Sequence, residues 1–314
     1  MIIERVGRVV RGLGGLYVTR VEVDGETERY TTRAKGVLKR DEERVQIGDE
    51  VKITLDTDIP DSAVISEILP RRSSLIRPPI ANLDYLFIVI AAKRPAPVLE
   101  TVDKLAAIAV HNKIKPVCVI TKADLDLSRA EEISEIYTLA GIPVFITSSA
   151  DGRGIDALAA YVRERVTDGA SAAFAGASGV GKSTLMNSLF PSLSLATAEI
   201  SQKIERGRHT TRHVELFDIT EGSDTGFLAD TPGFSLVDFE RFDFFSLSDL
   251  PATFPELLCY SGECRYADCT HVGEGKDECA VARAASEGKI SPSRLESYRS
   301  IWRVLKAKKP YEDK

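Results

Sequence analysis

The stretch that decides the fold reads Gly176-Ala177-Ser178-Gly179-Val180-Gly181-Lys182-Ser183-Thr184. It fits the pattern G-x-x-x-x-G-K-[ST] of a phosphate-binding loop. An apolar strand predicted over residues 172–175 precedes it and a helix predicted over residues 184–189 follows it, which is the context that the pattern requires. Glycines let main-chain N–H groups wrap the phosphates of a nucleotide, and a helix N-terminus adds positive potential. We therefore predict that Lys182 reaches the β- and γ-phosphates and that Ser183 binds Mg²⁺.

The residues upstream of this loop predict a parallel sheet covered by helices. Continuous apolar runs, typical of strands buried on both faces, occupy residues 86–92, 116–120, 144–146 and 172–175. Helical stretches separate them at residues 99–112, 129–140 and 155–166. This alternation is typical of an α/β domain, in which ligands bind beyond the carboxyl ends of the strands.

Residues 1–70 predict a different and smaller domain. Short β-rich segments with glycine turns between them lie at residues 6–10, 16–23, 28–32, 50–54 and 63–69. They favour a small barrel, with the OB-fold as the first candidate and an SH3-like barrel as the alternative. The next ten residues, 70–79, are rich in proline and arginine and predict a linker.

Two segments downstream of the phosphate-binding loop complete a predicted magnesium and γ-phosphate site. An apolar strand ends in Asp230-Thr231-Pro232-Gly233, where Asp230 would hold Mg²⁺ through a water and the Gly233 amide would contact the γ-phosphate. Residues 207–212 read Gly-Arg-His-Thr-Thr-Arg. A threonine there can bind Mg²⁺ only while the γ-phosphate is present, which makes the segment a switch loop. Thr211 is the first choice for this ligand, and Thr210 is the alternative.

A base-reading loop is predicted upstream, after the strand at residues 116–120. The loop reads Thr121-Lys122-Ala123-Asp124 and resembles the guanine-reading pattern N-K-x-D. Asp124 would accept hydrogen bonds from the guanine N1–H and exocyclic amine, while the stem of Lys122 would lie over the base. Adenine leaves such a buried acceptor unpaired, so the base is discriminated strongly. Thr121 stands where asparagine is usual, and we expect its single hydroxyl to tether the loop more weakly than an amide.

A second base-contacting loop follows the strand at residues 144–146. Thr147-Ser148-Ser149 resembles the S-A-K loop that lies behind the base, with Ser149 in place of alanine. The order along the chain is therefore base-reading loops, phosphate-binding loop and switch segments, whereas ordinary small GTPases begin with the phosphate-binding loop. Because every motif still follows an apolar strand, one nucleotide site can form from this circularly permuted order.

Four of the five cysteines lie close together near the C-terminal end. They include the run Cys264-x4-Cys269-x-His271-x7-Cys279, with Cys259 nearby as a possible replacement ligand. Three thiolates and one imidazole make a closed tetrahedral set suited to structural Zn²⁺. Together with the helical pattern after residue 240, this predicts three domains. We expect an OB-fold barrel at residues 1–72, a circularly permuted GTPase domain at residues 73–240, and a helical zinc-binding domain at residues 241–314.

The bulk composition sets limits on location and partners. The net charge of −6 argues against a nucleic-acid-binding coat over the whole surface but allows local basic patches. One candidate is residues 286–309, which hold seven basic and two acidic residues, and another is the barrel, with Arg20 and Arg29 among its basic residues. With neither a long apolar span nor a signal-peptide pattern, we expect a cytoplasmic protein.

Taken together, these motifs resemble the RsgA (YjeQ) family of small-ribosomal-subunit biogenesis GTPases, over nearly the whole chain. The resemblance implies an OB-like barrel, a permuted GTPase domain and a zinc domain. It also implies GTP/GDP, Mg²⁺ and Zn²⁺ as cofactors, ribosome-stimulated hydrolysis, binding to the 30S subunit and its 16S rRNA, and a role in late subunit maturation. We expect the protein to act as a monomer.

The motifs lack the usual group that orients the attacking water. A glutamine that orients the attacking water often follows D-x-x-G, but Phe234 stands there and cannot orient water by hydrogen bonding. His209, beside the switch threonines, is our candidate, the alternative being that it contacts RNA or shapes the loop. Two rival functions remain: a P-loop kinase of a small molecule, which would prefer ATP, and an RNA-binding scaffold whose ribosome binding would ignore GTP.

Overall fold

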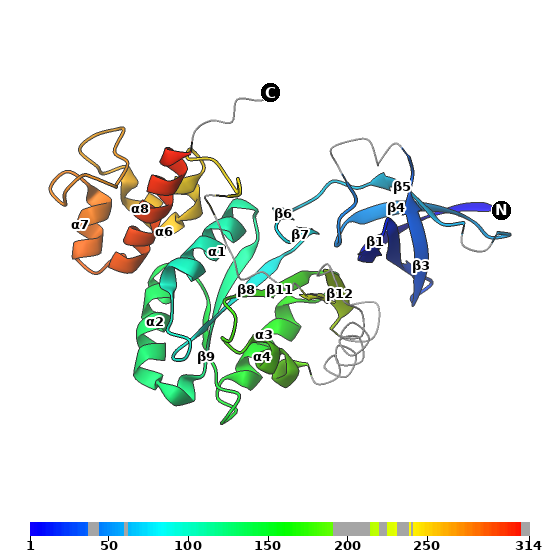
Figure 1. The fold of residues 1–314 in the computed structure, drawn as a ribbon, viewed down its shortest axis with the longest axis horizontal. Helices are drawn as coiled ribbons and strands as arrows, with labels where there is room; N and C mark the ends of the chain where they lie inside the picture. The colour runs from blue at the N-terminus through cyan, green and yellow to red at the C-terminus, as the bar shows by residue number, and fades with distance from the viewer. Residues whose placement is uncertain are drawn as a thin grey trace. The chain divides into compact units, whose positions relative to one another are not determined.

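The computed structural model, shown in Figure 1, describes residues 1–36, 44–59, 62–190, 214–219, 225–230, 239 and 241–308. The chain divides into two compact units. The first contains residues 1–85, 159–174 and 186–234, and the second contains residues 86–158, 175–185 and 235–314. Among the described helices, none combines the length and apolar character that crossing a membrane requires.

The first unit begins with the predicted five-stranded barrel. Its strands are β1 (Ile2–Leu13), β2 (Leu16–Val23), β3 (Glu26–Ala34), β4 (Glu50–Asp56) and β5 (Val64–Ile68). They pair in the order β1-β2-β3-β5-β4, and β4 pairs with β1 to close the barrel. Alternate residues of β4, Val51, Ile53 and Leu55, are buried, as the two-residue period of a strand dictates. The closed five-stranded sheet confirms the predicted OB-like barrel.

Strand β1 is longer than the predicted segment 6–10. Its first half pairs with β4 and its second half with β2, so β1 joins these two strands of the barrel. Gly7 and Arg8 pair with both strands, and a Cβ added at Gly7 would lie 2.5 Å from the carbonyl oxygen of Arg20. A glycine is therefore needed where β1 passes from one partner to the other.

The predicted linker at residues 70–79 is only partly correct. Within it and just beyond it, β6 (Ser74–Ile76) pairs with β7 (Pro79–Ala81) in a small antiparallel hairpin. Leu75 and Ile80 lie opposite each other and are 1% and 0% exposed. Their burial explains why this proline-rich segment folds into a hairpin instead of forming a linker.

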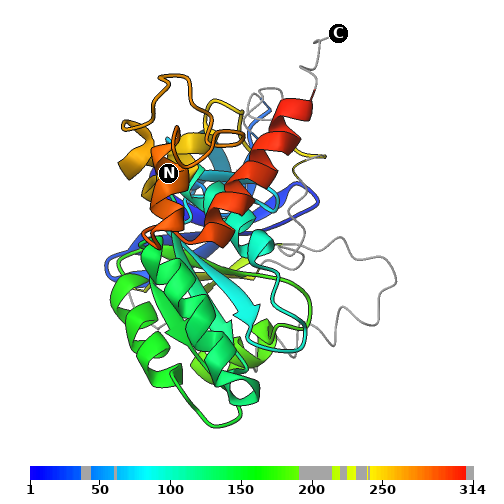
Figure 2. The same ribbon diagram turned by 90° about the vertical axis from the view of Figure 1, so that its left-hand side faces the viewer.

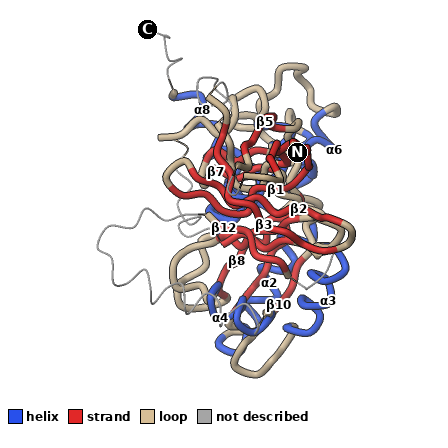
Figure 3. The backbone as a smooth tube through the Cα atoms, turned by 90° about the vertical axis from the view of Figure 1, so that its right-hand side faces the viewer, coloured by secondary structure: helices blue, strands red, loops and turns tan. Residues whose placement is uncertain are grey.

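Three more strands lie in the first unit, apart from the last residue of the first of them. They are β11 (Ser171–Ala175), β12 (Glu215–Asp218) and β13 (Phe227–Asp230). β11 runs parallel to β13, β13 runs antiparallel to β12, and β12 pairs with β1 of the barrel at Arg11 and Glu215. Figure 3 shows β12 beside the barrel strands. The barrel is thus hydrogen-bonded directly to the strand pair that ends in Asp230.

The second unit contains the remaining parallel strands, in the order β10-β9-β8. Their bounds are β8 (Tyr85–Ala91), β9 (Lys115–Thr121) and β10 (Val144–Ile146). Helices α1 (Leu99–His111) and α2 (Leu127–Leu139) follow β8 and β9, and α3 (Ile155–Arg165), which follows β10, has its first four residues in this unit and the rest in the first unit. Every residue of β8 is buried, as predicted for a strand covered on both faces.

The C-terminal part of this unit is helical. It contains a short 3-10 helix (Leu250–Thr253), α6 (Pro255–Ser261), α7 (Ala280–Ser286) and α8 (Pro292–Ala307), grouped together in Figure 1. Helix α8, the long helix at the C-terminal end in Figure 2, packs against α1.

The basic segment at residues 286–309 is not the continuous surface that its composition suggested. Arg294 is 2% exposed, and its Nη1 lies 2.9 Å from Asp103 of α1 while its Nη2 lies 2.7 Å from Glu256 of α6. Arg299 donates to the carbonyl oxygen of His271, and Lys308 pairs with Asp243. Arg294 is therefore a buried connection between helices, and the prediction that it belongs to a basic surface is wrong.

Candidate nucleotide site and metal centre

The phosphate-binding loop has the backbone that its glycines predict. Gly176 has φ +147°, and an added Cβ would lie 2.2 Å from the carbonyl oxygen of Val89, so no other residue fits there. Gly179 and Gly181 also have positive φ. Helix α4 (Lys182–Leu189) begins two residues before the predicted start at residue 184, which brings its first free N–H groups into the loop.

The lysine of the loop folds back over it. Lys182 Nζ donates to the carbonyl oxygens of Gly176 at 2.7 Å and Ala177 at 2.8 Å. Partial burial lowers the pKa of Lys182 from its ordinary value. Ser178, Ser183 and Thr184 are exposed at the loop surface and the helix start, so their hydroxyls are accessible to a ligand.

The base-reading loop and the phosphate-binding loop are tied by hydrogen bonds. Thr121 Oγ1 donates to the carbonyl oxygen of Val180 at 2.5 Å. Lys122, at φ +56°, places its Nζ 2.7 Å from the carbonyl oxygen of Gly179 and 2.6 Å from that of Arg94. Thr121 is 5% exposed and its hydroxyl reaches the phosphate-binding loop itself, so a threonine can link the two loops where an asparagine is usual.

The two base-contacting loops are also joined to each other. Ser148, which is buried, donates from Oγ to Asp124 Oδ1 at 2.7 Å and accepts from the main-chain N–H of Ala150 at 3.2 Å. The N–H of Ala123 donates to the carbonyl oxygen of Thr147. These bonds fix the Asp124 carboxylate, which still has acceptor positions available for a base. Ser149 lies exposed beside them.

A cavity of about 400 Å³ lies where these loops meet, within the second unit. Its lining consists of Arg94, Thr121, Lys122, Asp124, Leu125, Ser149, Ala150, Gly181 and Thr184. The volume is within the range of ligand pockets, about 300–1,000 Å³. Our reading of the sequence missed Arg94, although its place just after the carboxyl end of β8 is where α/β sheets bind ligands.

The switch residues are only partly within the described chain. His209, Thr210, Thr211, Gly233 and Phe234 lie outside it. Asp230 ends strand β13, opposite Glu215 of β12, as its backbone pairing shows, and its side chain is not described. The strand before the D-x-x-G motif is therefore present as predicted.

The four predicted metal ligands do come together. Nδ1 of His271 lies 3.6 Å from Cys264 Sγ, 3.4 Å from Cys269 Sγ and 3.4 Å from Cys279 Sγ, and all four ligand atoms lie within 4.8 Å of one another. A tetrahedral ion with Zn–S of about 2.3 Å and Zn–N of about 2.0 Å requires S···N distances of about 3.5 Å. The cluster therefore fits Zn²⁺. Cys259 is exposed, contacts the carbonyl oxygen of Pro255 and lies outside this cluster.

Comparison with known proteins identifies the family. The sequence model of the RsgA GTPase matches residues 68–240, and that of the RsgA N-terminal domain matches residues 6–60. Curated relatives described as "small ribosomal subunit biogenesis GTPase RsgA" include one from Alkaliphilus metalliredigens, 35% identical over 97% of this chain and 99% of that protein, and one from Enterococcus faecalis, 37% identical over 97% and 96%.

Solved structures agree with this result. YjeQ from Thermotoga maritima matches 98% of this chain and 100% of its own, with a TM-score of 0.79 at 29% identity. YloQ, described as a circularly permuted GTPase, matches 98% of this chain and 97% of its own, with a TM-score of 0.76 at 29% identity. The permuted order of motifs, the geometry of the loops and these full-length matches agree, and the chain belongs to the RsgA family of circularly permuted GTPases.

Proposed function

We propose that this protein binds and hydrolyses GTP and acts in the biogenesis of the small ribosomal subunit, as the names of its relatives state for them. The observation that carries the proposal is the pair of hydrogen bonds from Thr121 and Lys122 to the phosphate-binding loop. They join a loop built to read guanine to a loop built to hold phosphates. A small-molecule kinase would have no use for the guanine-reading carboxylate of Asp124.

Each residue of the site has a role in this proposal. The phosphates lie against the amides of the loop, whose residues are Gly176, Ser178, Gly179, Val180, Gly181, Lys182, Ser183 and Thr184. Lys182 exchanges its loop carbonyls for β- and γ-phosphate oxygens. Ser183 and Thr211, with Thr210 as the alternative, supply hydroxyl ligands to Mg²⁺, and Asp230 supports them through a water. Bound Mg²⁺ neutralises charge on the phosphates, and the Gly233 amide contacts the γ-phosphate.

Hydrolysis needs a group that orients the attacking water, and we propose His209. We expect His209→Ala to lower ribosome-stimulated turnover at least about tenfold while GTP affinity changes little, because the residue would act only on the water. Single-turnover hydrolysis with saturating 30S subunits measures this. His111→Ala, in α1, is the matched control. An unchanged stimulated rate for His209→Ala would remove the residue from the mechanism.

The proposal extends to partners and domain limits. We infer that the protein binds the 30S subunit through its 16S rRNA, as a monomer in the cytoplasm. The cysteine and histidine cluster would hold one structural Zn²⁺, since four protein ligands leave no open position for catalysis. The functional domains would be the barrel at residues 1–72, the GTPase domain at residues 73–240 and the zinc domain at residues 241–314.

GTP turnover with and without purified 30S subunits tests the proposed function. We expect 30S subunits to raise turnover about tenfold or more. Phe234 stands where a water-orienting glutamine is usual, so efficient hydrolysis would need a partner to bring another group, such as His209, to the attacking water. Equal amounts of 50S subunits and substitution of ATP for GTP are the controls. Stimulation by both subunits, or equal turnover of ATP, would contradict the proposal.

A further inference from the structure

Two arginines of the barrel lie against the ring of one phenylalanine of the GTPase sheet. Phe227 begins β13, and its ring lies 4.8 Å from the guanidinium carbon of Arg8 and 5.3 Å from that of Arg20. The ring is 3% exposed, and the side chains of Arg8 and Arg20 are 11% and 7% exposed. Cations stacked on an aromatic face attract it most strongly where water is excluded, as here.

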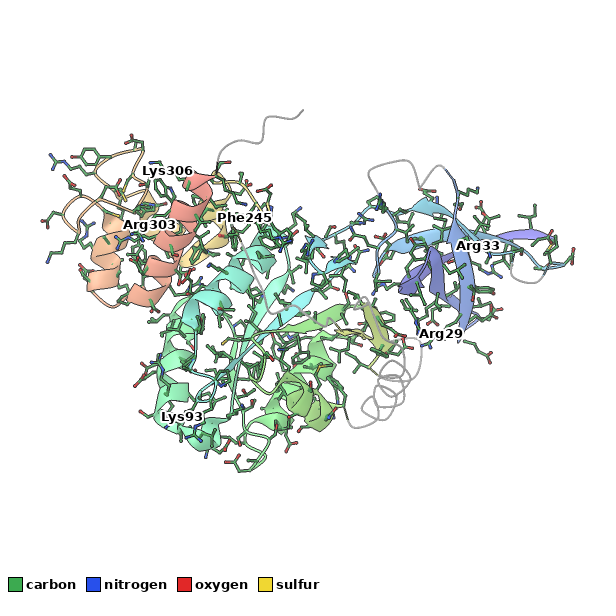
Figure 4. All side chains as sticks on the ribbon, viewed as in Figure 1. Arg29, Arg33, Lys93, Phe245, Arg303 and Lys306 are labelled. Atoms are coloured by element: carbon green, nitrogen blue, oxygen red, sulfur yellow. The ribbon has the colours of Figure 1, made fainter. Side chains whose placement is uncertain are left out.

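The same arginines are fixed by carboxylates. Arg20 Nε lies 3.1 Å from Asp218 Oδ1, and Arg29, labelled in Figure 4, lies 2.6 Å from Asp218 Oδ2. Arg20 Nη1 also lies 2.6 Å from Glu22. Asp218 ends β12 and is paired with Phe227 in the strand ladder, so barrel arginines hold adjoining residues of both strands. Arg20 was a candidate for RNA contact on the basis of its charge. It is instead buried between the barrel and the strands β12 and β13.

Arg8 extends this interface toward the strand that leads into the phosphate-binding loop. It donates to the carbonyl oxygen of Gly169, two residues before β11, and its Nη2 lies 2.8 Å from Glu50 of the barrel. The N–H of Gly169 donates to the carbonyl oxygen of Thr225, just before β13. One guanidinium thus contacts the barrel, the start of β11 and, through Phe227, the start of β13.

Asp230, the residue proposed to support Mg²⁺, lies at the other end of the β12–β13 pair. In the ladder of β12 and β13, Glu215 lies opposite Asp230, and Arg11 of β1 is paired with Glu215. Arg11 Nε lies 3.8 Å from Glu215 Oε2. Both ends of the β12–β13 pair are therefore attached to the barrel, and a shift of the barrel must move the backbone at Asp230.

We propose that Arg8 and Arg20 are positioning residues for GTP hydrolysis: they hold β12 and β13 and so fix the backbone at Asp230, the residue proposed above to support Mg²⁺. This inference rests on the role given to Asp230 in the proposed function. It makes the barrel part of the hydrolytic apparatus as well as a binding domain. A partner that binds the barrel would then act on Asp230 through β12 and β13.

The test measures single-turnover GTP hydrolysis of the full-length protein against Mg²⁺ concentration, together with GDP affinity without Mg²⁺. For Arg20→Gln and Phe227→Leu we expect the half-saturating Mg²⁺ concentration to rise at least fivefold and the rate to fall about tenfold, since small displacements of catalytic groups are costly. GDP affinity should stay within about twofold, because the base-reading and phosphate-binding loops carry it. Arg5→Gln, an exposed site on β1, is the matched control and should resemble wild type.

The outcomes separate the two proposals. A purely structural interface would lower the melting temperature and leave the Mg²⁺ dependence unchanged, which would overturn the inference. Arg20→Lys keeps the charge but loses the planar guanidinium, so its half-saturating Mg²⁺ concentration should lie between those of the wild type and Arg20→Gln. If Arg20→Gln does not fold, Arg20→Lys provides the test. Asp230→Asn belongs in the same assay. If it raises the Mg²⁺ requirement and the arginine variants do not, only the inference fails; if it also behaves as wild type, the role of Asp230 fails with it.

Discussion

Replacing Asp124 with asparagine is expected to lower the affinity for GTP about 100-fold and to make xanthosine triphosphate the better ligand. The carboxylate accepts from two guanine donors, N1–H and the exocyclic amine. An asparagine offers one acceptor and turns an N–H toward the second donor, so a hydrogen bond is lost and a repulsion gained. Xanthine carries a carbonyl oxygen in place of the amine, which the asparagine N–H can meet. The bond from Ser148 to Oδ1 is retained, so the loop should keep its shape.

Equilibrium titration with fluorescent GTP and XTP analogues measures this reversal. Asp126→Asn is the matched control, because Asp126 lies two residues away, caps α2 by accepting from the N–H of Arg129, and can be replaced by asparagine as a cap. The control should bind GTP as wild type does. If Asp124→Asn kept its full preference for GTP, the base would be read elsewhere and the cavity lined by Asp124 would need another occupant.

Arg294→Met should destabilise the second unit by about 3–5 kcal/mol, since it leaves buried carboxylates without their partner. Arg294 is held between Asp103, which is 0% exposed, and Glu256, which is 7% exposed. Burial raises the pKa of Asp103 even though Arg294 opposes the shift. Protonation of Asp103 relieves part of the cost, and the expected loss is accordingly smaller at pH 5 than at pH 8.

Urea unfolding followed by the fluorescence of Trp302 measures the effect, because Trp302 is the single tryptophan and lies on α8. Arg303→Met on the same helix is the control. Its side chain is 54% exposed and pairs with Glu296, and removal of such a surface pair should cost less than about 1 kcal/mol. Equal urea midpoints for the two variants would mean that the buried cluster contributes nothing beyond an ordinary surface pair.

The nucleotide-binding and metal-binding residues were predictable because they belong to short local sequence motifs. The phosphate-binding loop at residues 176–184 and the ligand run from Cys264 to Cys279 each need only spacing and residue type, and the structure brings their members together. The strands around them were also predictable, since a run such as 86–92 is apolar throughout. The hairpin at residues 74–81 was missed, because proline and arginine there conceal two buried apolar side chains.

Long-range pairing was not predictable from local pattern. Arg294 and Asp103 are 191 residues apart in the chain, and nothing in either neighbourhood marks the one as the other's partner. Arg20 and Phe227 meet only because the barrel adds its first strand to β12. The charges of Arg20 and Arg294 suggested solvent-exposed or RNA-binding side chains. Both side chains are instead buried against partners that are distant in the sequence, and this burial gives them a structural role.

The position of Cys259 has a practical consequence for following this protein on a ribosome. Of the five cysteines, three belong to the metal cluster, and burial raises the pKa of the Cys118 thiol, which keeps it protonated and unreactive. Cys259 is exposed on α6. With the metal bound, the natural protein therefore offers a single attachment point for a maleimide dye or spin label. Movement of its C-terminal helices can be recorded without engineering a cysteine or removing one.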